Sequence, residues 1–282
     1  MRAWIFPGQP LRCESIGEVT PELVELDQLS RDLCGYDLVH CLPCAASPLT
    51  PHTVLQIHGV ASSLYRIRCL KKSDQTPDLI AEHSLGIYAA LSAAGCISEG
   101  EALMLSSRIG SCMSWMGSTQ DYALGCPIGL TAALVEAAAR NNGVFIANYN
   151  TSSHFLLAGR RQGIESALAE CQAAGAFSVS LFPCEAPLHT PLMAEIAEDL
   201  AAIVADYSFA DPIIPLIEHV EQTCLTAAAI PDFLVNELCQ PVWWERSYKS
   251  LLARGTSHFV EVGSGNALKK FNRWIDSEAV PL

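Results

Sequence analysis

The sequence is poor in basic residues. Lys and Arg total 17 against 30 Asp and Glu, which gives a formal net charge of -13. Binding to nucleic acid depends on clustered basic side chains that neutralise phosphates, so this balance argues against a nucleic-acid partner. An acidic small-molecule substrate is still compatible with it, because one buried arginine can hold a carboxylate against the field of the whole protein.

Long apolar runs are also missing. No stretch of about 18 residues is free of charged and turn residues, so we expect no membrane span. The N-terminal segment MRAWIFPGQP has neither a long apolar core nor a small-residue cleavage site. We therefore expect a cytoplasmic protein without a secretory signal.

Cysteine is frequent, with twelve in 282 residues. Without an export signal we interpret them as reduced thiols. A zinc site needs four convergent ligands, and the single close pair, Cys41 and Cys44, is a weak pattern. We expect no metal and no cofactor, although metal binding by the segment 34–69 stays open. That segment also contains Cys34, Cys69, His40, His52 and His58.

Half of the residues are hydrophobic and 17% are charged, which is typical of a globular chain. Short apolar strands alternate with helices over 1–120 and 184–282, which predicts a large domain with a parallel α/β sheet. Between them, 121–183 has the order strand, helix, strand, strand, helix, strand, which predicts an inserted ferredoxin-like subdomain. In the C-terminal part we expect a long helix over 190–209, a strand over 211–220 and a single helix over 231–255.

Ser84 lies in the segment EHSLG, between an apolar strand and an Ala-rich helix. A serine on such a turn projects above the sheet, and the N–H groups at the helix start can stabilise an oxyanion. The usual G-x-S-x-G pattern lacks its first glycine here, where Glu82 stands. From this segment alone, Ser84 as a helix N-cap is the alternative.

Several stretches occur in the order found in malonyl-CoA:acyl carrier protein transacylases, which the chain resembles nearly end to end. They are FPGQ (6–9), EHSLG (82–86), Arg108, IANYN (146–150), APLHTPLM (186–193) and VEVGSG (260–265). The family has an α/β-hydrolase-like large domain with a ferredoxin-like insertion, in agreement with the pattern above.

The resemblance implies roles for individual residues. Ser84 would carry the acyl group, and His189 would be its base and later its acid. A backbone carbonyl near Glu237 would orient the histidine. The oxyanion hole would use the backbone N–H groups of Gln9 and Leu85.

Substrate contacts follow from the same resemblance. Arg108 would hold the free carboxylate of a malonyl group, since a guanidinium fork matches a carboxylate; a surface arginine is its alternative. His83 would line the pocket. Asn148 and Asn150 would position the thioester or the pantetheine arm, unless they serve a hairpin turn. His258 is a weaker candidate for the histidine of an ordinary hydrolase.

Some positions depart from the family pattern. Leu188 stands where malonyl-selective relatives usually have phenylalanine, Glu237 where glutamine is usual, Pro10 where glycine is usual and Ile87 where glutamate is usual. These changes leave acyl selectivity open. They also allow a specialised member of a polyketide or malonate decarboxylase system.

The sequence therefore predicts an acyltransferase that moves malonyl from malonyl-CoA to an acyl carrier protein. A serine esterase or thioesterase of related fold and a non-catalytic binding protein are the alternatives. An acidic carrier protein needs a local basic patch, which we expect in one of two clusters that are otherwise merely solvated. The first is Arg66, Arg68, Lys71 and Lys72, and the second is Lys269, Lys270 and Arg273.

Overall fold

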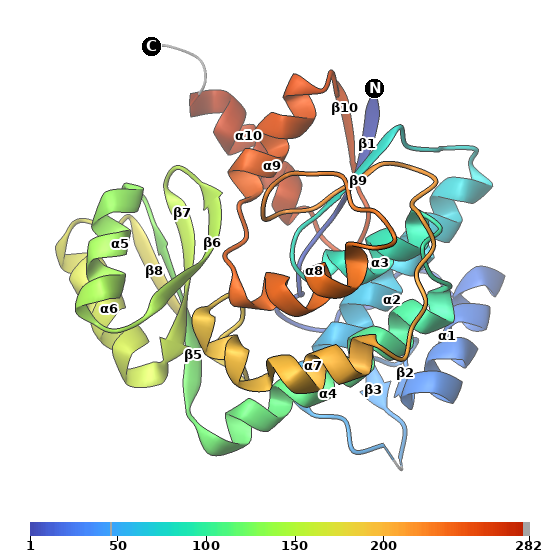
Figure 1. The fold of residues 1–282 in the computed structure, drawn as a ribbon, viewed down its shortest axis with the longest axis horizontal. Coiled ribbons are helices and arrows are strands. Elements are labelled where there is room, and N and C mark those ends of the chain that lie inside the picture. The colour runs from blue at the N-terminus through green and yellow to red at the C-terminus, as the bar shows by residue number, and fades with distance from the viewer. Residues whose placement is uncertain (46, 279–282) are drawn as a thin grey trace.

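The computed structural model describes residues 1–45 and 47–278, and its two main sheets belong to different parts of the molecule (Figure 1). The larger part is built on a parallel sheet with the strand order β10-β1-β4-β9. These strands are β1 (Arg2–Phe6), β4 (Leu79–Glu82), β9 (Leu216–Ile217) and β10 (His258–Glu261). The parallel sheet predicted for the large domain is confirmed.

Helices cover both faces of this sheet. Trp4 and Phe6 of β1 belong to the core formed with α1, α2, α3 and α4, whereas Ala3 and Ile5 belong to a second core with α9 and α10. Because successive residues of a strand point to opposite faces, this double burial explains why β1 is apolar from Ala3 to Phe6. The helices are α1 (Pro21–Cys34), α2 (Pro51–Lys72), α3 (Gly86–Ala93), α4 (Glu99–Thr119), α9 (Trp244–Ala253) and α10 (Ala267–Glu278).

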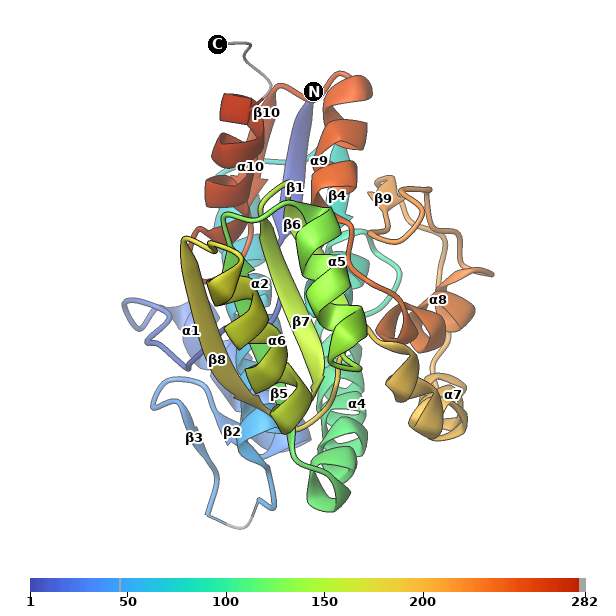
Figure 2. The ribbon, with the colours of Figure 1, turned by 90° about the vertical axis from the view of Figure 1, so that its left-hand side faces the viewer.

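The smaller part is an antiparallel sheet in the order β6-β7-β5-β8. In Figure 2 its helices α5 and α6 both lie in front of the sheet, so one face is covered and the other is turned toward the large domain. The predicted order of strands and helices is confirmed. The elements are β5 (Tyr122–Ile128), α5 (Ala132–Asn141), β6 (Phe145–Thr151), β7 (His154–Arg160), α6 (Arg161–Ala173) and β8 (Ser178–Cys184).

The single helix expected over 231–255 is wrong. Helix α8 (Ile230–Asn236) passes into a 3-10 turn, η2 (Glu237–Cys239), and α9 starts only at Trp244. Pro241 explains the break, since it has no N–H to donate and forces the preceding residue, Gln240, into the extended conformation that it adopts.

Other expectations need smaller corrections. The helix over 190–209 begins as a 3-10 helix, η1 (Pro191–Ile196), and continues as α7 (Ala197–Val204). The strand over 211–220 shortens to β9. Helix α1 was not predicted, although Thr20 caps it and Gly35 ends it in the left-handed conformation. Two short strands, β2 (Tyr36–Asp37) and β3 (Leu42–Pro43), follow α1.

Within residues 1–45 and 47–278, no helix combines the length and the apolar character needed to cross a bilayer. All twelve cysteines are free thiols. In that same part of the chain, the cysteines and histidines of 34–69 form no cluster of three potential metal ligands.

Candidate active site

Ser84 lies at the carboxyl edge of the parallel sheet, between the end of β4 and the start of α3. Its φ of 56° is in the left-handed region, which is strained for a residue with a side chain. Gly86 makes this turn possible, because a Cβ there would lie 2.5 Å from the carbonyl oxygen of Phe6. The tight turn holds the serine hydroxyl above the sheet.

His189 meets this hydroxyl from the segment between β8 and η1. Its Nε2 lies 2.6 Å from Ser84 Oγ, although the two residues are 105 positions apart. His189 is 3% exposed, and burial, reinforced by the nearby imidazole of His219, lowers its pKa to about 3. The imidazole is therefore neutral at rest, with Nε2 available to accept the serine proton.

The other ring nitrogen of His189 faces backbone oxygens. Nδ1 lies 3.2 Å from the carbonyl oxygens of both Glu237 and Gln240. A proton on Nδ1 can be donated to these acceptors, which favours the tautomer with a free Nε2. The contact with the backbone of Glu237 is the one that the sequence predicts, and Gln240 adds a second.

The two residues predicted for the oxyanion hole flank the serine. Leu85 follows it directly, and Gln9 lies in the loop after β1, at the same edge of the sheet. Within the described part of the chain, the backbone N–H groups of both residues form no hydrogen bond. The side chain of Gln9 accepts a hydrogen bond from Gln56. Stabilisation of an oxyanion by these groups stays a prediction.

His83, Asn148 and Asn150 are brought together across the two parts of the molecule. Nε2 of His83 lies 3.0 Å from Asn150 Oδ1 and 3.4 Å from Asn148 Nδ2. All three side chains are buried, and the asparagines lie within β6 rather than at a turn. Leu188 is half-buried beside His189. His258 is exposed at the start of β10.

Comparison with known proteins supports the same reading. The acyl transferase domain model matches residues 31–270. The chain belongs to the acyl transferase domain family. It is 32% identical to the malonyl CoA-acyl carrier protein transacylase of Salmonella typhimurium over 97% of this chain and 92% of that protein.

Other relatives extend the comparison. The corresponding transacylase of Bacillus subtilis is 30% identical over 99% of this chain and 92% of its own. The structure of the transacylase from Coxiella burnetii superposes with a TM-score of 0.90 at 28% identity, covering 98% of this chain and 91% of that one. A malonyl-transacylase solved in complex with a type II polyketide acyl-carrier protein superposes with a TM-score of 0.88 at 27% identity, covering 98% and 93%.

Arg108 does not join the serine and histidine of this acyl transferase domain. Its guanidinium donates to Asp206 at 2.7 Å, and 40% of its side chain is exposed. The segment after Asp206 is bonded to the far end of α3, since Ile213 N–H donates to the carbonyl of Ala94. The next residue of α4, Ile109, is fully buried in the core. The carboxylate-binding role of Arg108 stays a prediction that requires it to leave Asp206.

Sequence reasoning missed two residues, Glu82 and His219. Nδ1 of His219 lies 2.8 and 2.9 Å from the two carboxylate oxygens of Glu82, and both side chains are 0% exposed. On its other side, Nε2 of His219 lies 3.6 Å from Oε2 of Glu237. The signal in the sequence was the missing first glycine of G-x-S-x-G, because Glu82 occupies its place.

A metal ion does not suit the cluster formed by His189, His219 and Glu237. Their potential ligand atoms lie within 4.8 Å of one another, but zinc prefers four ligands. An ion on Nδ1 of His189 would leave the proton on Nε2, which then cannot accept one from Ser84. The donor set therefore fits a network behind the catalytic base better than a metal centre.

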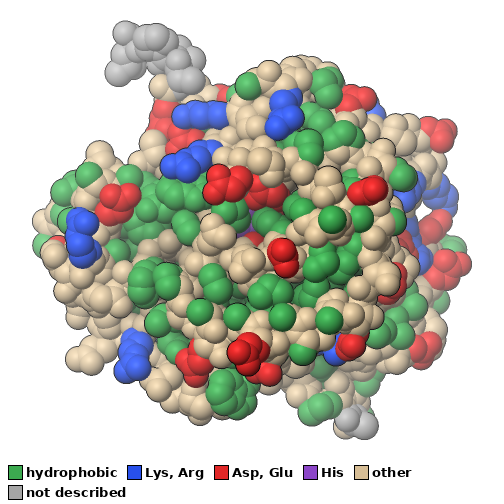
Figure 3. Space-filling view, in the orientation of Figure 1, with side chains coloured by type: hydrophobic (Ala, Val, Ile, Leu, Met, Phe, Trp, Pro, Cys, Tyr) green, Lys and Arg blue, Asp and Glu red, His purple; other side chains and the backbone are tan. Residues whose placement is uncertain are grey.

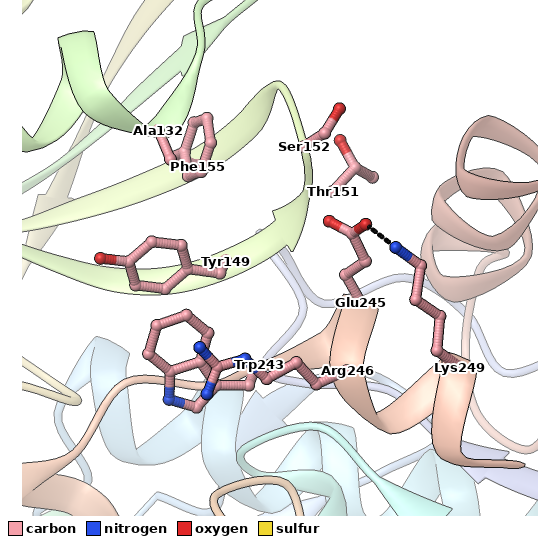
Figure 4. Close-up of a pocket in the computed structure, with 9 residues that line it drawn as sticks. All are labelled: Ala132, Tyr149, Thr151, Ser152, Phe155, Trp243, Glu245, Arg246 and Lys249. Atoms are coloured by element: carbon pink, nitrogen blue, oxygen red, sulfur yellow. Dashed lines mark hydrogen bonds and ion pairs between the residues drawn. The ribbon is translucent and has the colours of Figure 1, made fainter. Parts of the chain in front are cut away.

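An open pocket of about 280 Å³ lies where β6 meets α9 (Figure 4). Tyr149 stacks on Trp243 with ring centroids 4.0 Å apart, and the guanidinium of Arg246 covers the same indole at 3.6 Å. Tyr149 and Asn148 are successive residues of β6, so the pocket lies on the opposite face of this strand from the Asn148 side chain that contacts His83.

Proposed function

We propose that this chain is a malonyl-CoA:acyl carrier protein transacylase that works through a malonyl ester of Ser84. The observation that carries the proposal is the 2.6 Å contact between the serine hydroxyl and a neutral imidazole at a tight strand-to-helix turn. The identity of about 30% with transacylases over nearly the whole chain supports malonyl-CoA as the donor.

The reaction has two halves. Ser84 Oγ attacks the thioester carbonyl while Nε2 of His189 takes its proton, and the N–H groups of Gln9 and Leu85 receive the oxyanion. The imidazolium then gives its proton to the departing CoA thiolate. In the second half the phosphopantetheine thiol of the carrier attacks the ester, and the same groups act in reverse order. The reaction needs no metal ion or cofactor.

The carrier protein is proposed to dock beside the pocket of Figure 4, because exposed basic side chains gather there. In Figure 3 they lie over α9 and α10 in the upper part of the view. None of the three on α10 forms an ion pair within the described residues, whereas in the other predicted cluster Arg68 pairs with Glu99 and Lys72 pairs with Glu22. The exposed residues are Arg246, Lys249, Lys269, Lys270 and Arg273.

A second candidate is the transfer of an uncharged acyl group. It is favoured by the pairing of Arg108 with Asp206 and by the buried Ile109 next to it. A substrate without a carboxylate has no need of a guanidinium. A cytoplasmic location and membership of a polyketide or malonate decarboxylase system stay predictions.

Product analysis tests the transfer. The enzyme is incubated with malonyl-CoA or acetyl-CoA, with and without a holo carrier protein, and free acid and acyl-carrier are quantified. The proposal expects malonyl-carrier as the main product and little free malonate. Free acid as the main product, with the carrier unloaded, would instead identify a thioesterase. Acetyl transfer without malonyl transfer would support the second candidate.

A further inference from the structure

Behind His189, three buried titratable side chains, Glu82, His219 and Glu237, form with it a continuous four-residue network that acyl transfer by a serine and a histidine does not require. Glu82 contacts His219, His219 faces Glu237, and Glu237 Oε2 lies 3.4 Å from Nδ1 of His189. None of the four is more than 3% exposed. Burying so many ionisable groups is costly unless they satisfy one another.

Two atoms of this network indicate that a proton is shared between Glu237 and His219. Oε2 of Glu237 and Nε2 of His219 are both buried, and neither has a hydrogen-bond partner among the residues that the structure describes. They face each other at 3.6 Å, just beyond hydrogen-bond distance, so an approach of a few tenths of an ångström lets one proton serve both atoms, one as donor and the other as acceptor. Nδ1 of His219 is held by Glu82, which leaves Nε2 as the nitrogen that faces Glu237.

We propose that Glu237, His219 and Glu82 are positioning residues that place a carboxylate behind His189 when the imidazole becomes protonated. The inference rests on the acyl-transfer function proposed above. When Ser84 Oγ–H breaks and the proton moves to Nε2 of His189, the proton shared by Glu237 and His219 moves to Nε2 of His219. Glu237 is then an anion 3.4 Å from the Nδ1–H of the imidazolium. The proton on Nδ1 of His219 passes to the carboxylate of Glu82, so His219 stays neutral, which is the state that its burial favours.

Other titratable groups face this network, and the variants used in the test below leave them unchanged. The carboxylate of Glu218 is tied to backbone N–H groups of Val220 and Thr223. The buried hydroxyl of Tyr88 and the imidazole of His83 lie on the side of α3 and β6, and Cys239 lies in the same 3-10 turn as Glu237. Among the described residues, none of these groups links two of the four residues of the network.

The test uses a fluorophosphonate probe, which reacts with an activated serine and needs neither CoA nor a carrier. Glu237→Gln keeps the side-chain shape and both backbone contacts of His189 but removes the carboxylate. We expect its labelling rate to fall about 10- to 100-fold, the range of a charge-assisted hydrogen bond, with probe affinity unchanged. The acidic limb of the rate profile moves to lower pH, because the anion that favours the imidazolium is gone.

A double-mutant comparison separates this role from simple packing. In His219→Asn the shared proton has no acceptor, so its rate and profile should match those of Glu237→Gln, and the double variant should be no slower than either. Cys239→Ala, in the same turn, is the matched control and should label at the rate of the parent.

The outcomes are distinguishable. Failure of the parent protein to label at Ser84 would refute the proposed function. A parent that labels, with Glu237→Gln showing the same rate and the same acidic limb, would refute the network. If the His219→Asn variant is already unfolded at the assay temperature, the labelling rate and the pH–rate profile of Glu237→Gln alone decide between these results.

Discussion

Replacing Arg108 by alanine tests the acyl group most sharply. To hold a malonyl carboxylate, the guanidinium has to leave Asp206. Their side chains are 40% and 61% exposed, so the pair contributes only about 0.2–1 kcal/mol. A charged hydrogen bond to the substrate in the cleft is worth about 1.5–3 kcal/mol. Because the parent gives up this ion pair to make that bond, a difference of about 0.5–2.8 kcal/mol remains, and the R108A variant should load malonyl about 2- to 100-fold more slowly.

The assay is single-turnover acylation of the enzyme by malonyl-CoA and by acetyl-CoA. Acetyl loading should stay within about twofold of the parent rate, because acetyl offers no carboxylate. Asp206→Ala is the matched control: it removes the competitor and should raise malonyl loading by about 1.4- to 5-fold. If R108A leaves the malonyl-to-acetyl ratio unchanged, Arg108 belongs to a surface ion pair, and transfer of an uncharged acyl group becomes the better account.

Three further predictions concern the turn, the buried carboxylate and the docking face. Gly86→Ala puts a Cβ 2.5 Å from the carbonyl oxygen of Phe6 and should slow Ser84 labelling by about 100-fold, as expected for a displaced nucleophile; a parental rate would contradict the turn described here. Burial raises the pKa of Glu237 well above its ordinary 4.5, so the folded state keeps a proton that the unfolded chain loses as pH rises. The free energy of unfolding of the parent should therefore fall relative to Glu237→Gln between pH 5 and 8, by up to about 1.4 kcal/mol per pH unit, and a constant difference in chemical denaturation would refute this. Lys269→Glu with Lys270→Glu should raise KM for the carrier about 10-fold and leave acylation by malonyl-CoA unchanged, whereas Lys71→Glu should change neither; equal effects from both helices would contradict the docking face.

The local parts of the site were predictable because their causes are local. A buried strand, a serine and a glycine two positions later specify the turn at Ser84 through the space available beside Phe6. The alternation of strands and helices likewise follows from side-chain period and burial. The break at Pro241 was also available in the sequence, since proline removes the N–H that a continuous helix needs.

Other features depend on neighbours that the sequence does not bring together. Glu82 ends β4 and His219 follows β9, so their contact exists only because those two strands are adjacent in the sheet. The partner of Arg108 is set by how the segment after α7 packs. The local pattern alone shows only that Glu82 stands in place of the first glycine of G-x-S-x-G. It gives no partner for the guanidinium of Arg108.

The most direct test of the whole account is the site of acylation. The enzyme is exposed to malonyl-CoA, quenched in acid and digested, and the modified peptide is sequenced by mass spectrometry. The account predicts a malonyl mass increment on Ser84 that disappears in Ser84→Ala and forms far more slowly in His189→Ala. An increment on another residue, or one that persists in Ser84→Ala, would contradict it.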